Sequence, residues 1–127
     1  MNIYLAGGMR ADWRTGITLT VPRHTYYSPA THGLKDWTEY SPWDFSAIDH
    51  CDWLFGYFEK DNPSGFGLCC EIGYAKGKGK RVLFVNEHED NWDKNKYLKL
   101  IRFCSDVYYA NLLDGVNFLT ALQYIQT

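Results

Sequence analysis

Two carboxylic acids and a tyrosine stand where they could do chemistry together. Glu71 follows the turn-forming residues 61–65 and lies near the start of an expected helix. Asp44 lies in the expected first turn of another helix, and Tyr4 belongs to an apolar stretch near the N-terminus. Either carboxylate could instead only complement the positive end of its helix. If the three groups meet, one carboxylate can attack an anomeric carbon while another group handles the proton.

The elements that must bring these residues together alternate between strands and helices. Apolar stretches predict strands at residues 2–6, 21–27, 53–58, 81–85 and 106–110. Helices are expected at residues 11–20, 42–50, 67–77, 94–104 and 113–125. This alternation predicts an α/β fold: a doubly wound, mainly parallel five-stranded sheet with helices on both faces, like a flavodoxin or Rossmann sheet.

Such a sheet predicts where the ligand lies. Parallel sheets of this kind bind ligands beyond the carboxyl ends of their strands, and the helices that lead into the next strand begin at that same edge. Residues 4–10, Asp44 and the loop to Glu71 should therefore converge there. Gly7 and Gly8 end the first strand and allow close approach of backbone to a ligand. They do not form a dinucleotide fingerprint, because the GxGxxG spacing is absent.

The helix that carries Asp44 has an expected start. Ser41 is a good N-cap and Pro42 a good first helical residue. Phe45 and Ile48 would then face the core. The preceding residues 28–40 are polar and predict a long loop of the kind that often carries function.

Length and composition restrict the classes of function. The 127 residues predict one domain, residues 1–127, and a net charge of −2 gives no footprint for nucleic acid or an anionic membrane. No apolar run approaches the roughly 20 residues that span a bilayer. The first residues lack a basic n-region and predict a strand, hence a cytoplasmic protein with reduced thiols. The four cysteines and four histidines show no metal-ligand spacing, so neither a metal nor another cofactor is expected.

Several further side chains have more than one interpretation. The aromatic content of 17% suggests that some rings line a pocket, and Trp43 is a candidate because it adjoins Asp44. Arg14 could bind phosphate, although such an arginine more often lies on a solvated helix face. Glu59 and Asp61 could line the mouth of the pocket.

Three stretches of the chain carry a resemblance to a known family. They are IYLAGGMR at residues 3–10, WDFSAIDHCDWLFGYF at residues 43–58 and GFGLCCEIGYAKGKGKRVLFV at residues 65–85. The last contains G-x-x-x-E-x-G-x-A followed by G-K and a strand. Together they resemble the nucleoside 2-deoxyribosyltransferases and the related nucleoside and nucleotide N-glycosidases.

The resemblance implies a role for each residue of the site. Glu71 matches the nucleophile that attacks C1' and forms a glycosyl ester. Asp44 matches an aspartate that contacts the sugar and assists proton transfer, and Tyr4 a tyrosine that holds the nucleophile. The other substrate-binding residues implied are Gly7, Gly8, Met9, Arg10, Trp43, Ser64, Gly65 and Gly67, with Arg10 facing a phosphate in the nucleotide-cleaving branch.

The sequence departs from the family at one position and leaves the reaction open. Transferases carry an aspartate where this chain has Gly65, and the serine of the nucleotide-cleaving branch is matched only by Ser64, one residue further away. Three functions are therefore considered: transfer of 2-deoxyribose between nucleobases, hydrolysis of nucleoside 5'-monophosphates, and a non-catalytic nucleotide-binding module. The expected partners are a small nucleoside or nucleotide and further copies of the chain, in a homo-oligomer.

Overall fold

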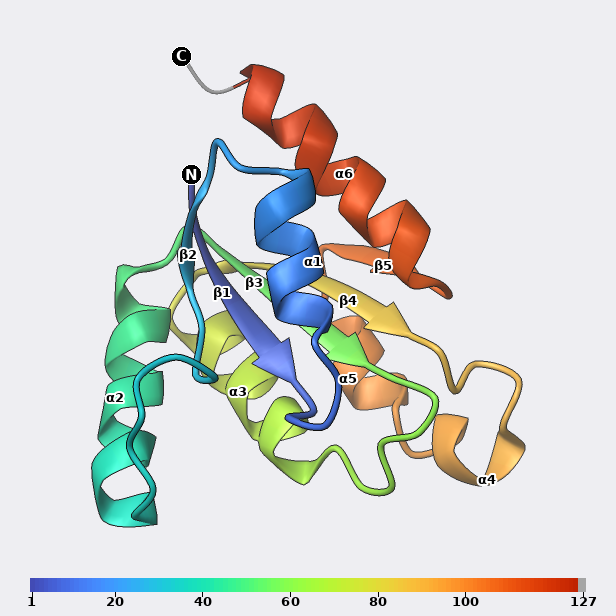
Figure 1. Ribbon diagram of the computed structural model, residues 1–127. Coiled ribbons are helices and arrows are strands. Elements are labelled where there is room, and N and C mark those ends of the chain that lie inside the picture. Colours follow the sequence, from blue (N-terminus) through green and yellow to red (C-terminus); the bar gives the residue numbers. More distant parts are fainter. Residues whose placement is uncertain (126–127) are drawn as a thin grey trace.

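The computed structural model, which describes residues 1–125, contains the predicted parallel sheet. Its strands are β1 (Asn2–Gly7), β2 (Thr25–Tyr27), β3 (Trp53–Phe58), β4 (Arg81–Asn86) and β5 (Val107–Tyr109). All neighbouring strands pair in parallel, in the order β2-β1-β3-β4-β5 (Figure 1). The α/β, doubly wound prediction is confirmed.

Helices cover both faces of the sheet, also as predicted. They are α1 (Trp13–Thr20), α2 (Trp37–His50), α3 (Phe66–Gly77), α4 (Trp92–Asn95), α5 (Lys99–Phe103) and α6 (Leu112–Ile125). Helices α1 and α6 lie on one face, and α2, α3 and α5 lie on the other (Figure 1). None of the helices in residues 1–125 has the length and apolar character that a membrane crossing requires.

The alternation of side chains along β1 decides which face carries the chemistry. Ile3 and Leu5 pack in the cluster under α1 and α6. Tyr4, between them, points the other way and packs with residues of α2 and α3 such as Ile48 and Ile72. The hydroxyl of Tyr4 is therefore directed towards the two helices that carry Asp44 and Glu71.

Helix α2 begins earlier than the sequence predicts. Asp36 is its N-cap and accepts a hydrogen bond from the backbone N–H of Thr38 at 2.8 Å. Pro42 lies inside the helix, where it and Thr38 are both exposed, so water can reach the Thr38 carbonyl that Pro42 leaves unpaired. The prediction of Ser41 as N-cap is wrong. Asp44 consequently lies beyond the first turn, and complementing the helix dipole does not explain it.

The predicted helix at residues 94–104 is also wrong, because α4 and α5 replace it. Asn91 caps α4 by accepting a hydrogen bond from the backbone N–H of Lys94 at 3.3 Å. The chain then turns, which places Leu98 in the core but leaves Tyr97 and Phe103 exposed at 76% and 78%. The segment therefore breaks into two short helices around the buried Leu98, and it does not present the continuous apolar stripe of one long helix.

Candidate active site

A pocket of about 220 Å³ opens at the carboxyl ends of β1 and β3. This is the point at which the chain order reverses, since β1 connects to β2 on one side while β3 lies on the other. Doubly wound sheets bind ligands at this position. The lining residues are Gly7, Met9, Pro29, Asp44, Asn62, Ser64, Gly65, Phe66, Gly67, Leu68 and Glu71.

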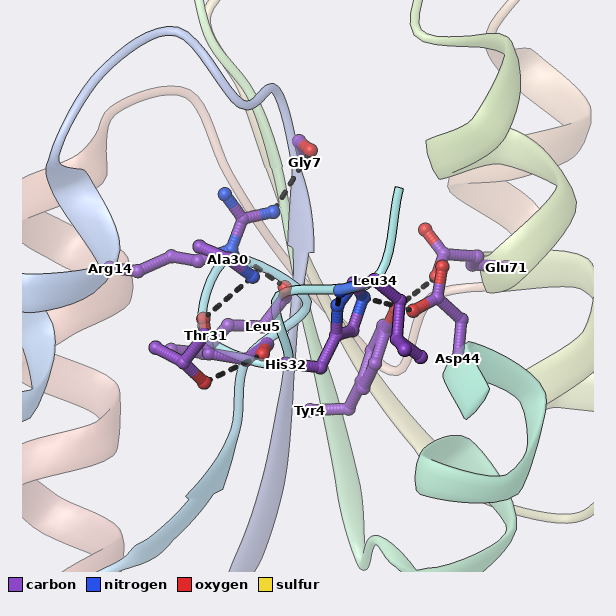
Figure 2. A network of polar contacts seen from close by, with 11 residues as sticks. Tyr4, Leu5, Gly7, Arg14, Ala30, Thr31, His32, Leu34, Asp44 and Glu71 are labelled. Atoms are coloured by element: carbon purple, nitrogen blue, oxygen red, sulfur yellow. Dashed lines mark hydrogen bonds and ion pairs between the residues drawn. The ribbon is translucent and has the colours of Figure 1, made fainter. Parts of the chain in front are cut away.

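Glu71 and Tyr4 are joined at the base of this pocket. The hydroxyl of Tyr4 donates a hydrogen bond to Oε2 of Glu71 (Figure 2). Burial raises the pKa of Glu71 to about 7, and the charge of Asp44 acts in the same direction; the hydrogen bond from Tyr4 and the charge of Arg14 oppose this rise. The carboxyl group is therefore set to exchange its proton near neutral pH.

Asp44 faces Glu71 from α2 (Figure 2). Burial raises its pKa as well, against the opposing effects of His32, Arg14 and Tyr4. Its Oδ1 is buried and has no hydrogen-bond partner in the described part of the chain, while Nε2 of His32 lies 3.7 Å away. Two carboxyl groups with raised pKa values thus share one pocket, an arrangement suited to proton transfer.

Arg14 lies beneath the site rather than on a solvated helix face, and that interpretation is wrong. The side chain is only 5% exposed. Its guanidinium donates hydrogen bonds to the carbonyls of Leu5 at 3.1 Å, Gly7 at 3.0 Å and Gly8 at 2.8 Å. Arg14 therefore holds the turn after β1, and its positive charge lowers the pKa of Glu71.

Gly7, the last residue of β1, can only be glycine, whereas Gly8, the next residue, lies against the end of a side chain. A Cβ on Gly7 would lie 2.5 Å from the carbonyl oxygen of Tyr57, and Gly7 has a φ of 152°. A Cβ on Gly8 would lie 1.8 Å from Oε1 of Glu59. The glycines thus allow the backbone after β1 to come close to β3 and to Glu59, the residue that follows β3. Of the two glycines, Gly7 lines the pocket and Gly8 does not.

The loop before α3 places Gly65 and Ser64 at the pocket. Gly65 adopts a left-handed conformation as the N-cap of α3, and a Cβ there would lie 2.8 Å from the ring of Phe58. Oδ1 of Asn62 accepts hydrogen bonds from the backbone N–H groups of Ser64 and Gly65, each at 3.2 Å. This geometry does not accommodate the aspartate that transferases carry here.

Two of the predicted substrate-binding residues, Arg10 and Trp43, do not line this pocket. Arg10 lines a neighbouring pocket of about 300 Å³ together with Thr15 and Thr31. Trp43 packs edge-on against the ring of His32, with ring centroids 4.7 Å apart. Tyr4 is fully buried and reaches the site through its hydroxyl.

A further pocket, of about 330 Å³, adjoins the pocket that contains Glu71. It shares Met9, Pro29 and Asp44 with that pocket, and His32, Leu34 and Tyr40 complete its lining. Sequence reasoning missed His32, because an isolated histidine in a polar loop shows no ligand spacing. The only signal for it was the unusual length of that loop.

Fold and site together define a class: a doubly wound α/β protein with two carboxylates and a tyrosine at its switch point. The chain belongs to the nucleoside 2-deoxyribosyltransferase-like family, whose model matches residues 1–89. This match spans β1 to β4 and includes Tyr4, Asp44 and Glu71.

Solved structures show the same fold. A 2-deoxyribosyltransferase from Bacillus psychrosaccharolyticus is 22% identical with a TM-score of 0.70, and the match covers 97% of this chain and 96% of that one. A 2-deoxyribosyltransferase from Leishmania mexicana is 17% identical with a TM-score of 0.68, covering 94% and 97%. The Clostridium botulinum CMP N-glycosidase BcmB is 17% identical with a TM-score of 0.63, covering 98% and 99%. Among curated protein sequences, none matches significantly.

Proposed function

We propose that this protein cleaves the N-glycosidic bond of a nucleoside and transfers the 2-deoxyribosyl group to another nucleobase through a covalent glycosyl–Glu71 intermediate. The observation that carries this proposal is the meeting of Tyr4, Asp44 and Glu71 at one pocket in a member of this family. A protein that only binds nucleotides has no need of two adjacent carboxyl groups with raised pKa values.

Glu71 is the proposed nucleophile. Tyr4 occupies Oε2, so Oε1 is the oxygen that attacks C1'. The C1'–N bond breaks as the C1'–O bond forms, and its electron pair leaves with the base nitrogen. The hydrogen bond from Tyr4 orients the carboxylate and favours its ionised form.

Asp44 is the proposed proton carrier. It lines both the pocket that contains Glu71 and the adjoining pocket that contains His32. In the protonated form, favoured by burial, it gives its proton to the departing base. An incoming base then attacks C1' from the vacated face, returns a proton to Asp44 and releases Glu71. Two inversions give net retention.

The two pockets suggest how the substrate is seated. The sugar would lie in the pocket over Glu71, and the planar base in the adjoining one, between Met9, Pro29, Leu34 and Tyr40. Trp43, which we expected to line the pocket, would instead support it indirectly by packing against His32, which lines the base pocket. An apolar base pocket favours a second base over water as the acceptor.

Hydrolysis of nucleoside 5'-monophosphates is the second candidate. Gly65 replaces the carboxylate that transferases use, and Ser64 lines the pocket in its vicinity. The similarity in fold to a CMP N-glycosidase supports the same alternative. Arg10 would serve it only if the phosphate reached the neighbouring pocket that Arg10 lines.

Base exchange tests the proposal directly. The protein is incubated with 2'-deoxyinosine and free adenine, and the products are separated by chromatography. We expect 2'-deoxyadenosine to form, and Glu71→Gln to reduce its formation by on the order of 10³-fold or more. A parallel reaction contains nucleoside 5'-monophosphates without an acceptor base.

The outcomes separate the candidates. Release of free base only from 5'-monophosphates would replace transfer by hydrolysis. Binding of nucleotides without any turnover would leave the non-catalytic module. Near-normal turnover by Glu71→Gln would show that Glu71 is not the nucleophile.

A further inference from the structure

We propose that His32 is a positioning residue whose Nε2–H holds Oδ1 of Asp44, so that Oδ2 of Asp44 is presented to the substrate. This inference rests on the role proposed for Asp44 and adds a residue from the loop between β2 and α2. His32 and Asp44 come from different elements and face each other across the edge of the site (Figure 2).

The protonation of the His32 ring follows from its other nitrogen. The backbone N–H of Leu34 donates a hydrogen bond to Nδ1 of His32 at 2.9 Å. A nitrogen that accepts a hydrogen bond carries no proton, so the proton of the neutral ring is on Nε2. Nε2 is the atom that lies 3.7 Å from Oδ1 of Asp44.

The carboxylate oxygen that faces His32 has a matching deficit. Oδ1 of Asp44 is buried and lacks a hydrogen-bond partner within residues 1–125. A buried acceptor left unpaired is costly, and the donor 3.7 Å away is less than 1 Å beyond ordinary hydrogen-bond distance of about 2.9 Å. A small approach of the two side chains satisfies both groups.

The surroundings of His32 restrict it to this direction. Its side chain is only 9% exposed, and Trp43 packs edge-on against the ring at 71°. Trp43 immediately precedes Asp44 on α2, so ring and carboxylate are held by the same helix turn. The arrangement resembles a histidine–carboxylate pair in which one group fixes the orientation of the other.

A matched pair of variants separates this role from a purely structural one. His32→Gln retains a donor at the position of Nε2 but loses the acceptor for Leu34. His32→Asn retains an acceptor at the position of Nδ1 but loses the donor for Asp44. We expect His32→Asn to lower kcat of the base-exchange reaction by on the order of tenfold, because proton transfer by Asp44 is impaired, and His32→Gln to retain more activity.

The reverse order would overturn the proposal. If the histidine only shapes the loop, His32→Asn retains more activity than His32→Gln. His50→Asn is the control, since His50 is exposed at the end of α2 and its Nδ1 lies 2.7 Å from the carbonyl of Ser46. In the Asp44→Asn background, the loss caused by His32→Asn should disappear; an undiminished loss would count against action through Asp44.

A second measurement does not depend on activity. Nitrogen-15 NMR of the imidazole groups in the free protein reports which nitrogen carries the proton. We expect His32 to show the Nε2–H form and its Nε2 resonance to move in Asp44→Asn, while the resonances of His24, which lies beside the carbonyl of Leu119, stay in place. An Nδ1–H form, or no response to Asp44→Asn, would refute the pairing. If no nucleoside reacts, the proposed function fails, and this spectrum still decides whether His32 holds Asp44.

Discussion

At the residue scale, Glu71 is subject to two opposing requirements. A nucleophilic carboxylate must be ionised, yet burial favours its protonated form and raises the pKa to about 7. Tyr4 and Arg14 counteract this effect by a hydrogen bond and by charge. The same burial removes water from the carboxylate, which strengthens its interaction with positive charge that develops at C1'.

The pH dependence of the reaction should report this balance. Because the ionised form of Glu71 is the nucleophile, Glu71 should give kcat/KM an acid limb near pH 7. At higher pH, kcat/KM should fall again as Asp44 loses the proton that it gives to the departing base. A pH profile from 4.5 to 9 checks this. An acid limb near 4.5, the ordinary value for glutamate, would contradict it. Arg14→Gln should move the limb to higher pH because the guanidinium lowers the pKa of Glu71, whereas Arg14→Lys, which keeps the charge, should move it less.

The stability of the protein should also depend on Glu71. Its pKa is about 7 in the folded state against 4.5 ordinarily, so the folded state binds the proton more tightly. The stability that this group contributes is complete below about pH 4.5 and is lost as the pH rises through about 7. Glu71→Gln cannot ionise but can still accept from Tyr4. We expect its Tm to exceed that of the wild type by more at pH 8 than at pH 5; an equal difference at both pH values would contradict this.

At the scale of elements, the end of β1 is the most constrained segment of the site. Gly7 pairs with Tyr57 of β3, and Arg14 of α1 binds the carbonyls of Gly7 and Gly8. These contacts fix the strand, the turn and the helix relative to one another, so Gly7 lies at the pocket with a rigid backbone. Flexible glycines in the sequence thus become a rigid turn in the fold.

Two glycine substitutions test this rigidity. Gly7→Ala should destabilise the protein by about 2 kcal/mol or more, because its Cβ would meet the backbone of Tyr57 and the φ of 152° disfavours alanine. Gly16→Ala is the matched control, because it is the same substitution in α1, the helix that follows β1 in the chain. Gly16 lies inside α1 with open space around it, so alanine should stabilise by about 0.5–1 kcal/mol. Urea unfolding measures both, and an unchanged stability of Gly7→Ala would refute the argument.

At the scale of the whole molecule, many large apolar side chains remain exposed. Phe66 is 81% exposed beside the pocket, and Tyr97, Leu100 and Phe103 are 76%, 72% and 78% exposed around α5. Association of several copies would remove such surface from water.

We therefore predict a homo-oligomer. Light scattering at micromolar concentration should give a multiple of the 14.8 kDa chain mass, and a dilution series should show whether the mass falls. A mass near 14.8 kDa throughout would contradict the prediction.

The sequence alone was sufficient to predict a parallel sheet, the alternation of strands and helices along the chain, and the helices on both faces. Those features depend on local patterns: apolar stretches such as residues 53–58, turn residues such as 61–65, and glycines that end helices. It also identified Glu71, Asp44 and Tyr4 as the candidates that the fold then brings together, because strand ends of a parallel sheet meet at one edge.

Tertiary structure alone decided the partners of these residues. Arg14 is buried because three carbonyls at the end of β1 face it, and no pattern around Arg14 in the sequence indicates this. His32 lies beside Asp44 because the loop after β2 folds back onto a helix that begins at Trp37. Local patterns report what each segment prefers by itself. Contacts between a loop, a helix and a strand end depend on how the segments pack, and they decided which way the side chains point.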